Sequence, residues 1–195
     1  MNNDEKLHYI KELGNECAIL RKAVTNELGQ IILDTAAVMS AVIGSGGKIL
    51  ITGNGGSAAD ASHFAGEMIV RLSSDKNRQS LPAIALCVDP AVMTAASNDY
   101  GYDRIFSRQV EGLGNKGDML FVMSTSGNST NIINAVQVAK DRNMISVGLL
   151  GGNGGKLAKM VDRAIVIPHP STQRVQEEHI FIIHLLVGLV ESDLI

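Results

Sequence analysis

The sequence predicts an α/β fold, in which one parallel five-stranded sheet is covered by helices on both faces. Between residues 48 and 167, short apolar runs of strand length alternate with helical segments, which is typical of a parallel sheet. Of the 195 residues, 45% are hydrophobic and 19% are charged, which is enough for one sizeable core. We expect a single domain over 1–195, with N-terminal helices over 1–44, an α/β core over 48–167 and a C-terminal helix over 172–194.

The N-terminal segment is predicted to be a helical hairpin. Apolar residues three or four apart give residues 5–28 one apolar stripe, and Gly29 is expected to end this helix. A second, more apolar helix is expected over Ile31–Ile43, closed by the glycine-rich turn Gly44–Gly47. The apolar stripe of the first helix needs a partner, which suggests packing against another subunit.

Strands and helices then alternate through the core. The expected strands are Ile49–Ile51, Leu81–Val88, Asp118–Met123, Ile145–Leu150 and Ala164–Ile167. The expected helical segments are Ala58–Glu67, Ala91–Ser97, Ile105–Leu113, Asn131–Arg142, the turn Lys156–Val161 and the long, mostly apolar Val175–Leu194. A turn is expected at Asn98–Gly101. In such sheets, ligands bind at the carboxyl ends of the strands, near the switch in strand order.

Composition excludes several classes of function. A net charge of −3 gives no electrostatic support to a nucleic-acid partner. The two cysteines, Cys17 and Cys87, lack metal-ligand spacing and imply no disulfide framework. The polar N-terminus carries no signal-peptide apolar region, and the apolar run Ile180–Val190 is too short to span a bilayer. We therefore expect a soluble cytoplasmic protein without a nucleic-acid or membrane partner.

The turn after the first strand is rich in glycine. Its residues are Gly53, Asn54, Gly55, Gly56 and Ser57, and a helix of small residues follows. This order presents several backbone N–H groups at a helix N-terminus, where the helix dipole favours an anion. A tight turn without a ligand is the alternative, because glycine-rich turns are common in α/β proteins.

A second loop of this kind follows the third strand. Ser124, Thr125, Ser126 and Ser129 place four hydroxyls before a helix, where they can hydrogen-bond phosphate oxygens. One such loop is more often an N-cap and a turn, but two loops at the ends of two strands favour a phosphorylated ligand. No lysine follows either loop and there is no GxGxxG turn, which argues against a Walker-type nucleotide site and against a dinucleotide. A sugar phosphate fits better.

Two helices carry side chains that could act together. His63 and Glu67 are four residues apart and share one helix face. Five polar residues lie at or near the start of the mostly apolar C-terminal helix: Gln176, Glu177, Glu178, His179 and His184. Helical spacing puts Glu177 and His184 on one stripe. A histidine in a buried helix is usually a core residue, so spacing alone leaves both interpretations open.

Four motifs together resemble the sugar-isomerase (SIS) family. They are GNGGSAADASHFAGE, SNDYGYDRIFSRQVEGLG, GDMLFVMSTSGNSTNI and RVQEEHIFIIH, spread over nearly the whole chain. They are most similar to the branch that converts sedoheptulose 7-phosphate to D-glycero-D-manno-heptose 7-phosphate, for ADP- or GDP-heptose in lipopolysaccharide or capsule. The resemblance implies a flavodoxin-like, three-layer SIS domain with a five-stranded parallel sheet. It also implies a homotetramer with active sites at subunit interfaces.

The resemblance implies roles for individual residues. Glu67 and His184 match the acid–base pair of the family. The positions that match substrate or phosphate contacts are Asn54, Gly55, Gly56, Ser57, Arg71, Asn98, Asp99, Ser124, Thr125, Ser126, Ser129 and Gln176. The positions that match zinc ligands in metal-containing members are His63, Glu67, Gln176 and His184, with one Zn²⁺ expected per subunit.

These residue types suit aldose–ketose isomerisation. A base removes a proton next to the carbonyl, and an acid serves the oxygens through an enediol intermediate. A divalent ion would stabilise the enediolate, and a donor set of two His, one Glu and one Gln is compatible with zinc. Two positions depart from the pattern. Gln173 stands where some relatives carry aspartate, and Glu177 shares the stripe of His184 although the resemblance favours Gln176 as the ligand.

The alternative function is non-catalytic binding of the replication initiator DnaA. A member of the family with the same fold and phosphate loops binds this initiator. It lacks the equivalent of Glu67 and has asparagine in place of His184, whereas this chain keeps both residues. The resemblance therefore favours the isomerase. A regulatory SIS module joined to a DNA-binding domain is disfavoured, because 195 residues without a basic helix leave no room for that domain.

Overall fold

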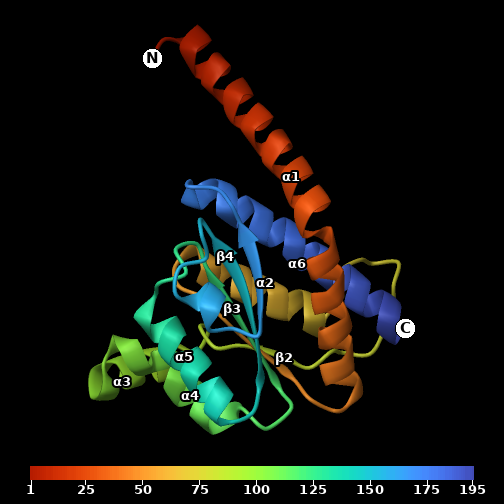
Figure 1. The fold of residues 1–195 in the computed structure, drawn as a ribbon, viewed down its shortest axis with the longest axis vertical. Coiled ribbons are helices and arrows are strands. Elements are labelled where there is room, and N and C mark those ends of the chain that lie inside the picture. Colours follow the sequence, from red (N-terminus) through yellow and green to blue (C-terminus); the bar gives the residue numbers. More distant parts are fainter.

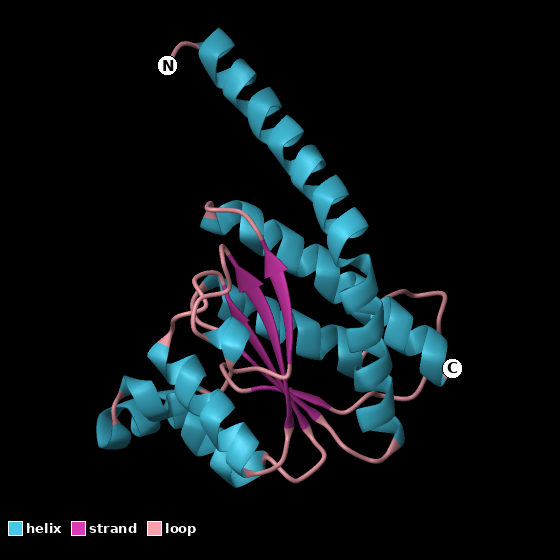
Figure 2. Cartoon of the chain, in the orientation of Figure 1, coloured by secondary structure: helices cyan, strands magenta, loops and turns pink.

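The computed structural model describes residues 1–195 and contains the predicted parallel sheet (Figures 1 and 2). The strands are β1 (Ile49–Thr52), β2 (Ala83–Ala85), β3 (Met119–Ser124), β4 (Ile145–Gly151) and β5 (Arg163–Ile167). They lie in the order β2-β1-β3-β4-β5, and each neighbouring pair is parallel. This flavodoxin-like order reverses between β1 and β3. The loops that follow these two strands therefore flank the position where such sheets bind ligands.

Helices cover both faces of the sheet, as predicted (Figure 2). They are α1 (Asn3–Gly44), α2 (Gly56–Ile69), α3 (Pro90–Tyr100), α4 (Ile105–Leu113), α5 (Thr130–Asp141) and α6 (Thr172–Leu194), with single turns η1 (Tyr102–Arg104) and η2 (Leu157–Lys159). Strand side chains alternate between two core layers: Phe121 packs with α1, α2 and α6, and the adjacent Leu120 packs with α3, α4 and α5. Because both faces are covered, every residue of β3 is buried.

The predicted N-terminal hairpin is wrong, because α1 is one continuous helix of 42 residues. It begins at a capping box formed by Asn2 and Glu5. Glycine ends a helix when it adopts a positive φ, and Gly29 is not among the glycines with that conformation. Its neighbours on both sides, such as Val24 and Ile32, are buried in the same core cluster, so tertiary packing continues the helix through the glycine.

Replacement of Gly29 by alanine is expected to stabilise the protein by about 0.5–1 kcal/mol. A Cβ at this position would meet no atom within 4 Å, and the helical backbone suits alanine better than glycine. Thermal or urea unfolding of the two proteins measures the difference. A hairpin with a left-handed glycine at the turn would be destabilised by the same change, so a lower stability of the variant would contradict the continuous helix.

The first half of α1 extends away from the rest of the molecule (Figures 1 and 2). Three of its large apolar side chains are uncovered: Leu7 is 56% exposed, Ile10 62% and Ile19 70%, whereas Leu20 is buried in the core. By length and composition alone α1 could also cross a membrane. A single helix of this kind is weak support for a membrane span, because helices of soluble proteins pass the same test. The second half of α1 packs on α6 and belongs to the core.

Two smaller boundaries differ from the prediction. Strand pairing in β2 covers Ala83–Ala85 and not Leu81–Val88, because β2 is an edge strand that pairs only with the short β1. The predicted turn at Asn98–Gly101 is instead the last turn of α3, which ends where Gly101 adopts a φ of 83°.

A buried ion pair fixes the link between α2 and β2. Arg78 Nε donates to Glu191 Oε1 at 2.7 Å, and both side chains are almost fully buried. The same guanidinium donates to the main-chain carbonyls of Glu67 and Met68 near the end of α2. Burial raises the pKa of Glu191, but hydrogen bonds from Arg78 and the Leu72 N–H hold it below its ordinary value. The last turn of α2 is thus tied to α6.

Candidate active site

The loop after β1 makes a close strand-to-helix turn. Gly55 precedes α2 with a φ of 55°, a conformation that glycine adopts without strain. A Cβ on Gly53 would lie 2.5 Å from the main-chain oxygen of Ser57, so only glycine permits this approach. Ser57 itself is buried in the first turn of α2. The predicted strand–turn–helix unit is therefore present.

The loop after β3 is ordered by its own hydroxyls. Ser124 Oγ accepts from the Gly127 N–H at 3.0 Å, and Ser126 Oγ accepts from the Asn128 N–H at 3.2 Å. Gly127 has a φ of 64°, and a Cβ there would collide with the main-chain oxygen of Gly154. The loop is thus pressed against the segment that follows β4, which limits its freedom to move.

The helices that follow these two loops have no side-chain caps. Gly55 before α2 and Ser129 before α5 make no capping hydrogen bond, whereas Asn2 caps α1 and Asp89 caps α3. The first N–H groups of α2 and the N–H groups of Thr130 and Asn131 in α5 therefore lack side-chain acceptors, at the ends of two adjacent strands, whereas the Ile132 N–H donates to Asn131 Oδ1. Such a pair of helix N-termini suits an anion like a phosphate ester.

Three titratable side chains meet where α2 packs on α6. Nε2 of His63 lies 2.8 Å from Nε2 of His184. Glu67 Oε1 lies 3.7 Å from His63 Nδ1. The other carboxylate oxygen, Oε2 of Glu67, is buried without a hydrogen-bond partner. Burying a carboxylate oxygen without a hydrogen-bond partner costs free energy, which a proton or a cation at this oxygen would offset. Glu67 Oε2 is therefore available to a proton or a cation.

These side chains fit part of the predicted zinc ligand set. Imidazole nitrogens and a carboxylate oxygen are donors that zinc takes. However, no group of three or more His, Cys, Asp and Glu side chains within this chain is close enough together to hold a metal ion. His63, Glu67 and His184 are therefore neighbours without forming a completed ligand shell.

Gln176, the fourth predicted ligand, lies at the other end of α2. A Cβ on Gly56 would collide with the Gln176 side-chain amide, so this amide rests on the backbone where α2 begins. On α6, Gln176 precedes His184 by a little over two turns, or about 12 Å. Gln176 thus accompanies the glycine loop, not the histidine pair.

Glu177 points to other partners. Its carboxylate accepts from Cys17 Sγ at 3.1 Å and from Arg174 Nη2 at 2.6 Å. Glu177 thus pairs with Cys17 and Arg174, and not with His63 or His184. Gln173 is exposed at the start of α6 and accepts from Ser171 Oγ at 2.8 Å.

Two more titratable residues of α2 and α6 are buried. Burial raises the pKa of Asp60 to about 6, with the nearby charge of His63 acting in the opposite direction. Burial lowers the pKa of His179 to about 4, so this ring is neutral near pH 7. His179 is fully buried, and for this histidine the interpretation as a core residue is correct.

Three predicted substrate residues lie away from the two loops or at their margin. Arg71 follows α2, whose ends are about 20 Å apart, so it does not reach the Gly53–Ser57 loop of its own chain. Its guanidinium donates to the Ser74 carbonyl at 3.3 Å. Asn98 and Asp99 are exposed in the last turn of α3, where Asn98 Nδ2 donates to Asp99 Oδ1 at 2.8 Å.

Two residues that contact Asn54 are absent from the predicted site. Asn131, in the first turn of α5, and Tyr102, in η1, both hydrogen-bond the Asn54 side chain. Each belongs to one of the family-like motifs, but nothing local distinguishes it there. The sequence separation from Asn54 is 77 residues for Asn131 and 48 for Tyr102, so no helical or strand period connects them.

The fold and the two loops define a class of protein. A parallel sheet of this order, with hydroxyl- and glycine-rich turns before two uncapped helices, is the arrangement of an SIS domain. The SIS domain family matches residues 9–151 of the chain, a range that includes both loops, His63 and Glu67.

Individual relatives narrow the assignment. The chain is 45% identical over 192 residues to the phosphoheptose isomerase of Aneurinibacillus thermoaerophilus, covering 98% of this chain and 94% of that protein. The structure of a phosphoheptose isomerase from Francisella tularensis superposes with a TM-score of 0.92 at 36% identity, over 96% of this chain and 98% of that one. The enzyme from Neisseria gonorrhoeae gives 0.89 at 40% identity, over 95% and 98%. The chain belongs to the phosphoheptose isomerase branch of the SIS family.

Proposed function

We propose that the protein is an aldose–ketose isomerase that converts D-sedoheptulose 7-phosphate to D-glycero-D-manno-heptose 7-phosphate. Family membership supports this reaction. The observation that carries the proposal is the unpaired Glu67 oxygen beside His63 and His184, on the helix whose N-terminus faces the glycine loop. Helix α2 thereby contributes both to phosphate binding, at its N-terminus, and to proton transfer, where it packs on α6.

In the proposed mechanism, the loops hold the phosphate and the helix pair moves the proton. The N-termini of α2 and α5, with the hydroxyls of Ser57 and of the Ser124–Ser129 loop, bind the 7-phosphate. Glu67 removes a proton from C1 of the ketose, and the electron pair forms the enediol as the C2 oxygen gains a proton. His184 exchanges protons with the O1 and O2 atoms. Return of a proton to C2 gives the aldose.

Zinc is a proposal for the same site. His63, Glu67 and His184 would hold the ion. The family implies Gln176 as the fourth ligand, and its amide, which here rests at the start of α2, would have to move to reach them. When bound, a zinc ion stabilises the negative charge that develops on the enediolate oxygens. The facing imidazole nitrogens and the orphaned Glu67 oxygen support this assignment.

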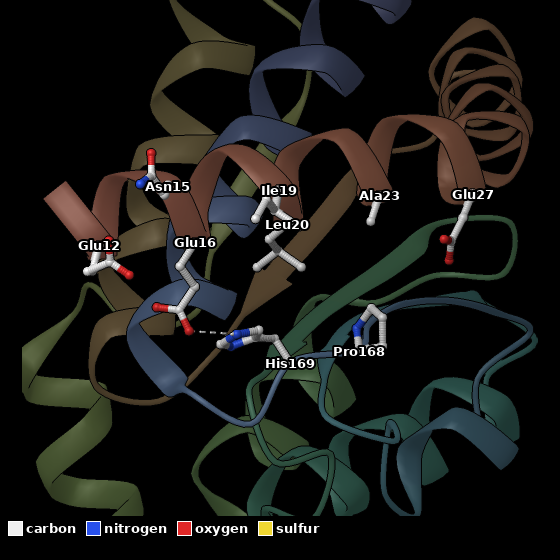
Figure 3. Close-up of a pocket in the computed structure, with 9 residues that line it drawn as sticks. All are labelled: Glu12, Asn15, Glu16, Ile19, Leu20, Ala23, Glu27, Pro168 and His169. Carbon is white, nitrogen blue, oxygen red and sulfur yellow. Dashed lines mark ion pairs between the residues drawn. The ribbon is translucent and has the colours of Figure 1, made fainter.

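A homotetramer with sites at subunit interfaces is also proposed. Arg71 is about 20 Å from the glycine loop of its own chain, so its role in substrate binding requires a neighbouring subunit. The uncovered apolar side chains of α1 give that neighbour a surface to bury. A groove between α1 and the segment before α6 adds to this surface (Figure 3). Its residues, Glu12, Asn15, Glu16, Ile19, Leu20, Ala23, Glu27, Pro168 and His169, include none of the predicted site.

The product would feed the synthesis of ADP-heptose or GDP-heptose for lipopolysaccharide or capsule. In this role the protein acts on a small molecule, and its net charge of −3 gives no electrostatic attraction for a nucleic-acid partner. A cytoplasmic location fits the metabolic role. Two free cysteines are compatible with a reducing compartment.

The proposed function is tested by NMR of sedoheptulose 7-phosphate with the purified protein in D₂O, before and after chelation and with zinc added back. We expect aldose with deuterium at C2, because the enediol exchanges its proton with solvent. Loss of turnover on chelation and recovery with zinc would support the metal assignment. Absence of both product and exchange would contradict the isomerase and favour the DnaA-binding alternative, which a pull-down with purified DnaA then examines.

Replacement of Ser126 by alanine is expected to raise KM for the sugar phosphate about tenfold and to leave kcat within about twofold. The hydroxyl would contact the phosphate equally in the ground state and the transition state, and a hydrogen bond to a charged group is worth about this factor. Steady-state kinetics measure both constants. The control is Ser80→Ala, because Ser80 is exposed and precedes β2, at the end of the sheet where the strands begin. An unchanged KM for the Ser126 variant would separate this loop from the phosphate.

A further inference from the structure

A chain of hydrogen bonds fixes the side-chain amide of Asn54 in the glycine loop. Asn54 Nδ2 donates to Asn131 Oδ1 at 2.9 Å, and Asn131 Nδ2 donates back to Asn54 Oδ1 at 2.9 Å. Tyr102 Oη lies 3.0 Å from the same Asn54 oxygen. Three elements that follow different strands therefore meet on one carboxamide: the β1–α2 loop, η1 and the first turn of α5.

The directions of these bonds follow from one main-chain group. The N–H of Ile132 donates to Asn131 Oδ1 at 2.9 Å, and a main-chain N–H can only donate. The atom of Asn131 that faces Ile132 must therefore be the oxygen, so its nitrogen faces Asn54. The Asn54 atom that receives this nitrogen must be Oδ1, and the Tyr102 hydroxyl must donate to it as well. Asn131 is 2% exposed, which keeps water from replacing these partners.

This arrangement leaves Asn54 with one kind of free group. Both lone pairs of Oδ1 are occupied, by Asn131 and by Tyr102. One N–H of Nδ2 is used by Asn131, and the second N–H has no partner in the chain. Asn54 can therefore act toward a ligand only as a hydrogen-bond donor.

We propose that Asn131 and Tyr102 are positioning residues that hold Asn54 as a donor to an oxygen of the bound sugar phosphate. The proposal rests on the function proposed above for this site. The ligand group that faces Asn54 is therefore expected to be a hydroxyl, carbonyl or phosphate oxygen that accepts a hydrogen bond, and not a group that donates one. Neither Asn131 nor Tyr102 needs to touch the substrate for this effect.

Tyr102→Phe and Asn54→Asp test the proposal with nearly isosteric changes. Tyr102→Phe removes one of the two bonds to Asn54 Oδ1, so we expect KM and the Kd for sedoheptulose 7-phosphate to rise about threefold to tenfold, with kcat within about twofold. Asn54→Asp keeps an acceptor for the Tyr102 hydroxyl and for Asn131 Nδ2, but removes both N–H groups, the free one and the one that donates to Asn131 Oδ1. We expect KM to rise by at least about tenfold, because an acceptor then faces the ligand oxygen.

The matched control is Tyr100→Phe, two residues away in the same motif. Tyr100 is 53% exposed and its ring stacks under Arg108, with no contact to Asn54. We expect unchanged KM and Kd for this variant. If Asn54→Asp bound the ligand as tightly as the parent protein, Asn54 would be a structural residue and the proposal would be wrong.

A measurement without ligand separates this proposal from the proposed function. In ¹⁵N–¹H spectra of the full chain, the side-chain NH₂ signals of Asn54 are identified by their absence in Asn54→Asp. Tyr102→Phe should shift these signals, and Tyr100→Phe should not. If the parent protein showed no turnover, only the isomerase function would be contradicted. If Tyr102→Phe changed neither the Asn54 NH₂ signals nor the ligand affinity, only the positioning role would be overturned.

Discussion

Replacement of Glu67 by glutamine is expected to lower kcat by about a hundredfold to ten-thousandfold, the range supplied by a positioned general base. The amide preserves the size and shape of the carboxylate, so the packing of α2 on α6 and the oligomeric state of the parent protein should persist. What disappears is the oxygen that can accept a proton, which in this structure is buried and has no other partner. Steady-state kinetics, with size-exclusion chromatography for assembly, measure both parts of the expectation.

Glu177→Gln provides the matched control for Glu67→Gln. It makes the same chemical change on a residue that pairs with Cys17 and Arg174 outside the site, so its activity should equal that of the parent protein. Exchange of substrate protons with D₂O should vanish with turnover in Glu67→Gln. Full activity in this variant would assign the base to another residue.

His184→Asn is expected to reduce kcat by at least about a hundredfold. The imidazole of His184 meets His63 at 2.8 Å, and asparagine can neither relay a proton at neutral pH nor supply a ring nitrogen to a metal. Kinetics with the chelated and the zinc-supplemented protein measure the loss. His169→Asn, a histidine that pairs with Glu16 away from this site, is the control and should remain active where size-exclusion chromatography shows unchanged assembly, because His169 also lines the groove proposed for subunit contact. A loss smaller than tenfold for His184→Asn would reduce that residue to a structural role.

Local patterns in the sequence predict most of the fold. Each strand run is apolar, because both faces of the sheet are covered, and each helix has its own periodicity. The error at Gly29 has a physical origin. A glycine marks a helix end only if the chain turns there, and the burial of Val24 and Ile32 against the same core decides that it does not. This burial depends on the tertiary structure of the folded chain, so the local sequence around Gly29 does not show it.

The candidate site likewise has one part that local sequence predicts and another part that depends on tertiary contacts. The two loops are predictable, because each lies within one strand–turn–helix unit whose backbone donors follow from local order. The position of Gln176 and the partners of Asn54 depend on contacts between distant segments. The ion pair between Arg78 and Glu191, which ties the end of α2 to α6, joins residues 113 apart and has no local signature.

The contact between Gly56 and Gln176 links the evolution of two motifs. A side chain at residue 56 would meet the far end of the Gln176 side chain, so the Gln176 amide would have to move away from the start of α2. Homologous sequences that use this glutamine at the glycine loop should therefore keep glycine at position 56. A larger residue at position 56 is expected in lineages where the amide at position 176 no longer serves the loop.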